Sequence, residues 1–432
     1  MRNPVVILRR PLVVMAVLAG LLGAAGWVAT ASQASSPKAG TAAPSGSLRI
    51  LWVTELPAPM QAVVKGFEKA YPKVHVNLEL VSGQNLQTVL TPQVRAGNPP
   101  DIAYTCGGAE TPYCVGALDP KGDNALLPLS GPWATATTKA IPDVAKFLTV
   151  KGKYYAAPLG LSAEMIFYNK TIFSSLGLKP PKLFSQLLSD CEKIAATGKT
   201  PFGFQAPITT PSYFMDEAAT HFVFYKDPNW AAQRIAGKTT FSKTAGWHRV
   251  LQAWLQMKND KCFSPGAAGE TSSSQAITDI AAGNTAMLIA STNTYPALLG
   301  INPKLQLGAF DMPGDSVAQR GATVGITFNL DVFRRGGNPT AARAFINFAE
   351  RPSELKAFNQ LAGTTSVNDF ATGRLPSFLD ELKSEAKYRT VIQPSTAYPS
   401  ASWVAQGVPS MIGLLTGQVS ISQELVALNG YF

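Results

Sequence analysis

Hydrophobic positions follow two periods in turn along the chain from residue 47 onward. Short apolar or alternating runs are typical of buried strands, whereas apolar residues three or four positions apart are typical of amphipathic helices. In the first part of the chain these periods predict a strand at 48–53, a helix with Val63, Val64 and Phe67 on its buried face that ends before Pro72, an alternating strand at 74–80, a helix at 86–94 and a strand at 101–104.

The same alternation of strands and helices returns after residue 158. It predicts strands at 165–168, 286–290, 305–310 and 324–330, and helices around 184–194, 247–254, 277–281 and 341–348, followed by a mostly helical C-terminal stretch with proline breaks. Strands that alternate with helices predict a parallel sheet covered by helices. We therefore expect an α/β protein with two lobes of similar size.

The N-terminus has the pattern of a secretory signal peptide. Arg2, Arg9 and Arg10 precede an uncharged run at 12–28, which ends in the small residues Ala29-Thr30-Ala31. We expect residues 1–31 to be removed, 32–46 to be a flexible tether, and the mature protein to be periplasmic or extracellular. The alternative is an uncleaved anchor, because an apolar run of this length is near the lower limit for spanning a bilayer.

Composition excludes several classes of function. The chain has 432 residues, of which 46% are hydrophobic and 15% charged, so it can bury a sizeable core. The net charge is +10, but the basic residues are scattered, with only isolated pairs such as Arg334-Arg335, and this does not predict nucleic-acid binding. His75, His221 and His248 form no metal-ligand spacing, so we expect no metal and no cofactor.

The four cysteines, Cys106, Cys114, Cys191 and Cys262, fit an oxidising compartment. Four cysteines allow three pairings, and the sequence alone does not choose among them. We favour Cys106 with Cys114, which would close a loop, and Cys191 with Cys262, which would join two helical regions. The alternative is four reduced, buried thiols.

A series of short motifs runs in order through residues 48–360. They are F-E-K-A-Y-P (67–72), A-G-N-P-P-D-I (96–102), G-K-Y-Y-A-A-P (152–158) with Y-N-K (168–170), A-G-N-T-A-M (282–287) and A-A-R-A-F-I-N-F (341–348). In this order and spacing the motifs resemble those of the extracellular solute-binding proteins that deliver carbohydrates to ABC importers, the group to which the maltose-binding protein belongs.

The resemblance implies a two-lobed periplasmic-binding-protein-like fold of type II, each lobe a mainly parallel sheet flanked by helices, with the ligand in the cleft at the strand ends. By analogy, lobe one would take 46–157 and 326–362, and lobe two 158–325 and 363–432. The hinge would lie near 158–160 and 321–325. The implied protein is a receptor without catalytic activity that presents a small carbohydrate to a membrane ABC permease, and we expect it to be a monomer.

A sugar site needs aromatic faces against the C–H surfaces of the ring and polar side chains that bond its hydroxyls. Candidates just after the expected strand ends are Glu55, Gln84, Thr105, Glu164, Asn293, Tyr295 and Thr323. Trp230, which we place in a loop after Asp227-Pro228-Asn229, and Trp403, which follows Tyr398-Pro399-Ser400, are candidate stacking platforms. Tyr213 belongs to an aromatic pair that would line the cleft. For Glu55 and Glu164 the alternative is a helix cap or an ordinary surface acid.

Two other functions remain open. The same scaffold could bind a non-sugar solute such as glycerol phosphate or a polyamine. A secreted glycoside hydrolase would need only two carboxylates about 5 to 10 Å apart. The nearest approach to a nucleophile motif, Gly160-Leu161-Ser162-Ala163-Glu164, lacks the final glycine of G-x-S-x-G.

Overall fold

A computed structural model describes residues 43–104, 125–141, 144–145, 148–150, 152–205, 209–270, 273–385, 390–392 and 407–431. The expected signal peptide and nearly all of the expected tether lie outside these residues, as do Thr105, Cys106, Cys114 and Trp403. Residues Pro44–Phe432 group into one compact unit. None of the helices in the described ranges is both long and apolar enough to cross a membrane.

A nine-stranded sheet runs through this unit in the order β2-β1-β3-β10-β6-β8-β7, with β11 beside β10 and β9 beside β6. The strands are β1 (Gly46–Val53), β2 (Val74–Val81), β3 (Ile102–Ala103), β6 (Ala156–Asn169), β7 (Thr200–Phe202), β8 (Thr285–Ser291), β9 (Leu307–Phe310), β10 (Ala322–Val332) and β11 (Thr390–Ile392). A separate hairpin pairs β4 (Thr149–Val150) with β5 (Lys153–Tyr154).

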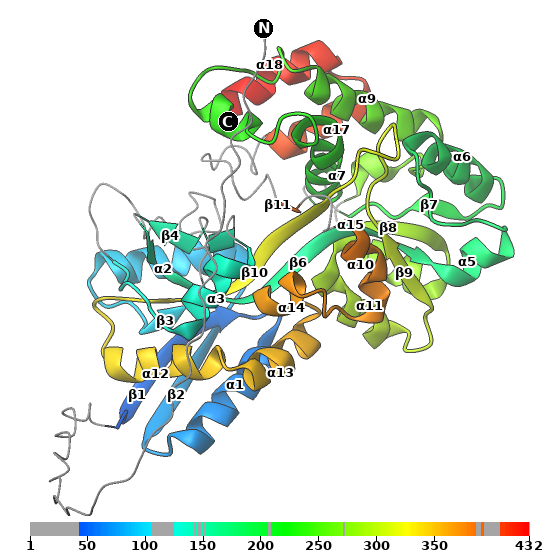
Figure 1. Ribbon diagram of the computed structural model, residues 1–432. Coiled ribbons are helices and arrows are strands. Elements are labelled where there is room, and N and C mark those ends of the chain that lie inside the picture. Colours follow the sequence, from blue (N-terminus) through cyan, green and yellow to red (C-terminus); the bar gives the residue numbers. More distant parts are fainter. Residues whose placement is uncertain are drawn as a thin grey trace, which may run out of the picture. The chain divides into compact units, whose positions relative to one another are not determined.

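The sheet is mixed in direction. β1 is parallel to β2 and β3, β7 is parallel to β8, and β11 is parallel to β10. β10 is antiparallel to β3 and β6, and β6 is antiparallel to β8 and β9. Figure 1 shows β6 and β10 as long strands that cross from the β1–β2 end of the sheet to the β8–β9 end. Because these strands carry the chain across and back, they pair antiparallel with each other, and the expected parallel arrangement is found towards the two ends and where the short β11 joins β10.

The helices cover this sheet. They are α1 (Pro57–Ala70), α2 (Leu86–Arg95), α3 (Pro132–Ala140), α5 (Lys170–Ser175), α6 (Phe184–Ala195), α7 (Thr209–Ala219), α8 (Trp230–Ile235), α9 (Ala245–Asn259), α10 (Ser273–Ala282), α11 (Tyr295–Ile301), α12 (Pro339–Ala349), α13 (Pro352–Ala362), α14 (Val367–Ala371), α15 (Asp380–Glu385), α17 (Val408–Thr416) and α18 (Ile421–Tyr431). Short helical turns include η1 (Gly83–Asn85), the π-helical turn η3 (Thr220–Phe224), η5 (Thr292–Thr294) and η6 (Ser377–Leu379).

Local sequence explains several of these boundaries. α1 has Pro57 in its first turn, where a missing N–H costs no helical hydrogen bond, and it ends at Ala70, just before Tyr71-Pro72. Asn169 caps α5, because its Oδ1 accepts hydrogen bonds from the backbone N–H of Thr171 (3.0 Å) and Ile172 (3.2 Å). The alternating strand expected at 74–80 is confirmed as β2, and the helix expected at 184–194 is confirmed as α6.

Two large hydrophobic clusters lie on opposite faces of β6. Leu161, Ala163 and Phe167 belong to one cluster, which continues into α1, α12 and α13. Ile166 belongs to the other, which is built largely from α6, α7, α9 and α17. Figure 1 shows α1, α12 and α13 gathered at the β1–β2 end and α7, α9 and α17 gathered at the other. The sheet is therefore the shared wall of both cores.

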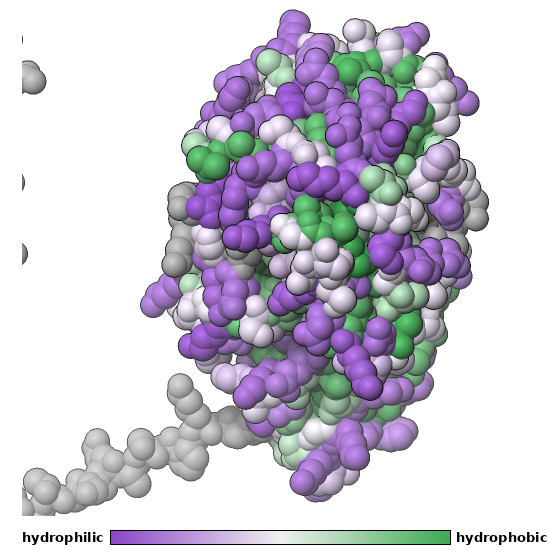
Figure 2. Space-filling view, turned by 90° about the vertical axis from the view of Figure 1, so that its right-hand side faces the viewer, coloured by the Kyte–Doolittle hydropathy of each residue, from purple (hydrophilic) through white to green (hydrophobic). Residues whose placement is uncertain are grey.

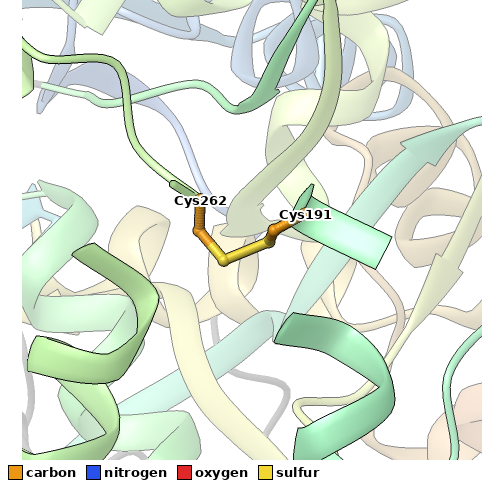
Figure 3. The surroundings of a disulfide bond; sticks show 2 residues. All are labelled: Cys191 and Cys262. Carbon is orange, nitrogen blue, oxygen red and sulfur yellow. A yellow bond between two sulfur atoms is a disulfide. The ribbon is translucent and has the colours of Figure 1, made fainter. Parts of the chain in front are cut away.

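A disulfide bond joins Cys191 of α6 to Cys262, which follows α9 (Figure 3). The two Cα atoms are 4.8 Å apart, and both side chains are fully buried. This pairing confirms one of the two bridges that the sequence favours. It closes the segment that contains β7, α7, η3, α8 and α9.

Large apolar side chains at the surface are scattered. Figure 2 shows one face, on which hydrophobic residues stand in small groups among hydrophilic ones. Those most exposed in the described part of the chain, such as Ile235, Ile301, Val317 and Val426, come from different elements. Scattered exposed apolar residues are ordinary for a folded domain and do not mark a binding face.

Candidate functional site

The central strand pair has one polar and one apolar face. In β10 the residues Val324, Ile326, Phe328, Leu330 and Val332 all pack against the same hydrophobic cluster as Leu161 of β6. Because side chains alternate between the two faces of a strand, the intervening residues point to the opposite face. These residues, together with their neighbours on β6, form what we call the polar strip: Ser162, Glu164, Thr323, Thr327, Asn329 and Asp331.

Hydrogen bonds join members of the polar strip to one another and to a neighbouring element. The hydroxyl groups of Ser162 and Thr327 are in hydrogen-bonding contact across the two strands. Thr323 Oγ1 lies 2.7 Å from Thr220 Oγ1, so η3 covers this end of the strip. At the other end the Asn329 amide donates to Asp331 Oδ1 at 3.1 Å.

Thr327 is the place where the polar strip is accessible. It is half-buried, whereas Thr323 and Asp331 are fully buried. The pairing of β6 with β10 is irregular between Ile326 and Asn329. Such bulges re-aim side chains and are common beside binding sites. The strip therefore offers hydroxyl groups at its centre and buried polar groups on either side.

Glu164 places a carboxylate on this face. It lies opposite Ser291 in the β6–β8 register and is only 2% exposed. The neighbouring Ala163 N–H donates to the Thr292 hydroxyl at 3.2 Å, which fixes η5 beside the strand. A carboxylate can accept several hydrogen bonds and is costly to bury without them.

Asp331 is the most buried acid of the polar strip. Burial raises the pKa of its carboxyl group well above the usual value, and the hydrogen bond from Asn329 opposes this only in part. Its Oδ2 atom has no hydrogen-bond partner among the residues that the structure describes. The carboxyl group of Asp331 therefore holds its proton more tightly in the folded protein than in the unfolded chain.

Replacing Asp331 by asparagine tests this assignment through the pH dependence of stability. An aspartate in the unfolded chain titrates near pH 4, so below that pH both states hold the proton, and stability is lost as the pH rises towards the raised pKa of the folded state. Asp331→Asn removes this loss. The stability of the variant relative to the wild type should rise by up to about 1.4 kcal/mol per pH unit above pH 4, measured by urea unfolding between pH 4 and 7. A difference that stays constant with pH would contradict the assignment.

The two lobe-one candidates that the structure describes lie together at the ends of β1 and β2. Glu55 is exposed, and its Oε1 accepts from Ser82 Oγ at 2.9 Å and from the Gly83 N–H at 3.0 Å. This contact ties the turn after β1 to η1, which contains Gln84. Glu55 thus has the capping contacts that the sequence left open as an alternative.

The predicted loop position of Trp230 is wrong. Trp230 begins α8 and is 1% exposed, with its ring centroid 4.8 Å from that of Phe241 and 5.2 Å from that of Trp247. Its Nε1 donates to Thr244 Oγ1 at 2.7 Å. The ring is therefore surrounded by core residues, and in this structure it offers no surface to a ligand.

The remaining candidates divide between the two faces of β6. Tyr213 of α7 is half-buried beside the cluster that contains Ile166. Asn293 is half-buried in η5, directly after β8. Tyr295 lies on the other face, where it stacks on Phe378 with the ring centroids 3.8 Å apart and the planes 5° apart. The structure thus brings Glu164 and Thr323 together on the polar strip and separates Tyr295 from them.

Four members of the polar strip were missed as candidates from the sequence: Ser162, Thr327, Asn329 and Asp331. The signal was present in the segment A-T-V-G-I-T-F-N-L-D-V (322–332), where polar residues or glycine occupy every second position. Such a period predicts a strand with one polar face. In a strand at the centre of a sheet, a polar face indicates a functional surface because both faces are normally apolar there.

Known proteins resemble the chain in sequence and in fold. The model of the bacterial extracellular solute-binding protein family matches residues 52–355. An uncharacterised ABC transporter extracellular-binding protein of Pyrococcus horikoshii is 28% identical over 360 residues, which cover 79% of this chain and 76% of that protein. The multiple sugar-binding protein of Streptococcus mutans is 25% identical over 329 residues, 72% of each chain. The structure of the solute-binding protein RafE in complex with raffinose aligns with a TM-score of 0.73 at 19% identity, covering 89% of this chain and 98% of that one, which shows a shared fold.

Proposed function

The chain belongs to the bacterial extracellular solute-binding proteins, and from this premise we propose that it is the receptor of an ABC importer that captures an oligosaccharide. The names of similar proteins support this class of ligand. One relative is named a multiple sugar-binding protein, and one solved structure with a similar fold is a complex with raffinose. The family is one of receptors, so the protein binds its solute without transforming it. The basic and apolar N-terminus supports export by a signal peptide.

The polar strip is the observation that carries the choice of ligand. A carbohydrate presents many hydroxyl groups, each of which donates and accepts hydrogen bonds. The strip supplies the matching groups: the half-buried hydroxyl group of Thr327, the buried hydroxyl group of Ser162 in contact with it, and the carboxylate of Glu164 beside them. We assign these three side chains to the floor of the sugar site, with Tyr213 and Asn293 as further candidates for its walls.

Closure about β6 and β10 would couple binding to transport. In the proposed mechanism the two lobes, with the boundaries expected from the sequence, close over the solute, and the permease binds the closed form. Gly160 lies within the proposed hinge, and a Cβ atom there would stand 2.6 Å from Thr364 Oγ1 and 2.7 Å from Asn359 Oδ1. The packing of the α13–α14 turn against β6 thus requires a glycine. We propose that the receptor acts as a monomer.

Thermal unfolding in the presence of candidate solutes tests the proposed function. A ligand that binds only the native state raises the melting temperature, so we expect a shift with oligosaccharides such as raffinose, without turnover of the sugar. A shift with glycerol phosphate or a polyamine instead would overturn the choice of a sugar. Hydrolysis of a glycoside would overturn the receptor itself.

Glu164→Gln tests the role of the polar strip. The change keeps the shape of the side chain but removes the charge, so hydrogen bonds from sugar hydroxyls weaken, and the affinity should fall about tenfold or more. Titration calorimetry with the oligosaccharide found by thermal unfolding measures this. Glu192→Gln, on the exposed side of α6, is the matched control and should leave the affinity unchanged. Equal affinities of the two variants for the oligosaccharide would show that Glu164 does not belong to the sugar site.

A further inference from the structure

A cavity lies on the face of β6 away from the polar strip. It has a volume of about 750 Å³, within the range of roughly 300–1,000 Å³ typical of small-molecule sites. We call it the α11–α13 pocket, because it lies between the start of α11, the C-terminal half of α13 and the segment from Gly363 to Phe378. The ring of Tyr295, which lines the pocket, stacks against Phe167, a residue on the apolar face of β6. The pocket is thus separated from the proposed sugar site by the central sheet.

One wall of the α11–α13 pocket is aromatic. Tyr295 and Phe378 are stacked on each other, both are half-buried, and both line the cavity. Leu375 and two prolines, Pro296 and Pro376, extend this wall. Rigid rings of this kind pack against the C–H face of a sugar or another small ring.

The lining of the pocket also includes basic side chains. Lys356 and Arg374 line it against a single carboxylate, that of Asp369. Asp369 Oδ1 accepts from Arg374 Nε at 2.8 Å, and its Oδ2 accepts from Ser366 Oγ at 2.8 Å, so both oxygens are engaged. Among the residues that the structure describes, Lys356 has no carboxylate partner, and the Nη groups of Arg374 have no acceptor. Within the described residues the pocket therefore has one positive charge without a carboxylate partner, that of Lys356, and the Nη donors of Arg374 are available to a ligand.

The shape of the pocket depends on backbone packing. Gly363 ends α13 in the left-handed conformation (φ 67°), and a Cβ atom there would stand 2.5 Å from Pro296 Cδ. The chain then pairs with β6, because the N–H groups of Leu161 and Thr365 each donate to the other's carbonyl at 2.8 and 2.9 Å. The buried Asn359 amide donates to the Leu159 carbonyl at 2.9 Å. These contacts fix the walls of the cavity to the rigid sheet.

We infer that the α11–α13 pocket binds a small polyhydroxylated ring compound that carries one negative charge, a sugar acid or a sugar phosphate. The ring packs against Tyr295 and Phe378, and the anionic group accepts hydrogen bonds from Lys356 and the free Nη groups of Arg374. Gln360 and Ser377, which are exposed at the cavity, are placed to bond ring hydroxyls. The inference does not rest on the proposed function, since the two sites share no side chain.

Titration calorimetry of the whole protein with D-glucuronate and with D-glucose 6-phosphate tests this site. We expect saturable binding of at least one of them, which identifies the carboxylate or the phosphate as the preferred anion. D-Glucose, which lacks the charge, and acetate, which lacks the ring, should each bind more weakly. Acetate binding as tightly as the ring compounds, or the absence of saturable binding by both anions, would overturn the inference.

Four variants locate the binding. The double variant Lys356→Gln, Arg374→Gln should bind the anionic compound about tenfold or more weakly, because its charge-assisted hydrogen bonds are lost. The control double variant Lys65→Gln, Lys73→Gln removes two exposed charges elsewhere and should bind it as the wild type does. Ser377→Trp places a large ring at the cavity without changing its charge and should weaken binding. Glu164→Gln should leave it unchanged, which separates this site from the proposed sugar site. Undiminished binding by the first variant would assign the anion to another site.

Discussion

Trp230→Ala is expected to lower the free energy of unfolding by about 3–5 kcal/mol, the usual cost of removing a fully buried aromatic side chain. The indole packs against Phe224, Phe241 and Trp247, so its loss leaves a cavity among rings that cannot collapse easily. Its bond to Thr244 is lost as well. Urea unfolding monitored by circular dichroism measures the change.

The same variant separates a structural role of Trp230 from the role in stacking that its sequence context suggests. Under conditions where the variant stays folded, its affinity for the oligosaccharide should equal that of the wild type. Trp230→Phe keeps the ring contacts and should lose only about 1 kcal/mol with the hydrogen bond. A variant of nearly normal stability with an affinity reduced tenfold would show instead that the indole contacts the ligand.

Replacing both Cys191 and Cys262 by alanine should lower the free energy of unfolding by about 4 kcal/mol. The bridge joins residues 71 positions apart, so its removal returns much conformational freedom to the unfolded chain. Both side chains are buried, and alanine leaves no polar group in their place. Chemical unfolding of the oxidised wild type and the double variant gives the difference.

The single variant Cys191→Ala is the control for this effect. It breaks the bridge and leaves one small thiol buried, so its stability should match that of the double variant within about 1 kcal/mol. Oxidised wild type and double variant of equal stability would show that the bridge does not constrain the unfolded chain.

The sequence predicted individual helices and strands better than it predicted which strands pair with each other. β2 and α6 were readable because apolar residues recur with one period over their whole lengths, and local spacing is enough to reveal it. The order of strands was not readable, since β10 lies between β3 and β6 through contacts more than 100 residues apart in the chain. The predicted α/β binding-protein fold is confirmed, with parallel pairs in the sheet. Only the antiparallel direction of β6 and β10 differs from the expected mainly parallel sheets, for the same reason: strand direction is set by how the chain crosses the sheet.

The candidate site was predicted in part. Glu164 and Thr323 were found by their places at expected strand ends, and the structure puts them on one polar face. Trp230 was misplaced because Asp227-Pro228-Asn229 is equally typical of a loop and of the turn that precedes a helix. The sequence around Tyr295 gave no sign that its ring stacks on Phe378, because that contact joins α11 to η6 from far along the chain.

The alternating faces of β10 have a consequence for how this receptor can change during evolution or in the laboratory. Even-numbered positions from Val324 to Val332 belong to the packed core, so substitutions there will be selected for volume and fold. The odd-numbered positions 323, 327, 329 and 331 belong to the polar strip, where exchange among serine, threonine, asparagine and glutamine alters hydrogen bonding with little effect on the packing of the apolar face. On the proposed assignment of the sugar site, a library restricted to residues 162, 164 and 327 would search solute preference while leaving the apolar face of the sheet unchanged, and lineages of this protein that use different solutes should diverge along the polar side of the strand and stay alike along the other.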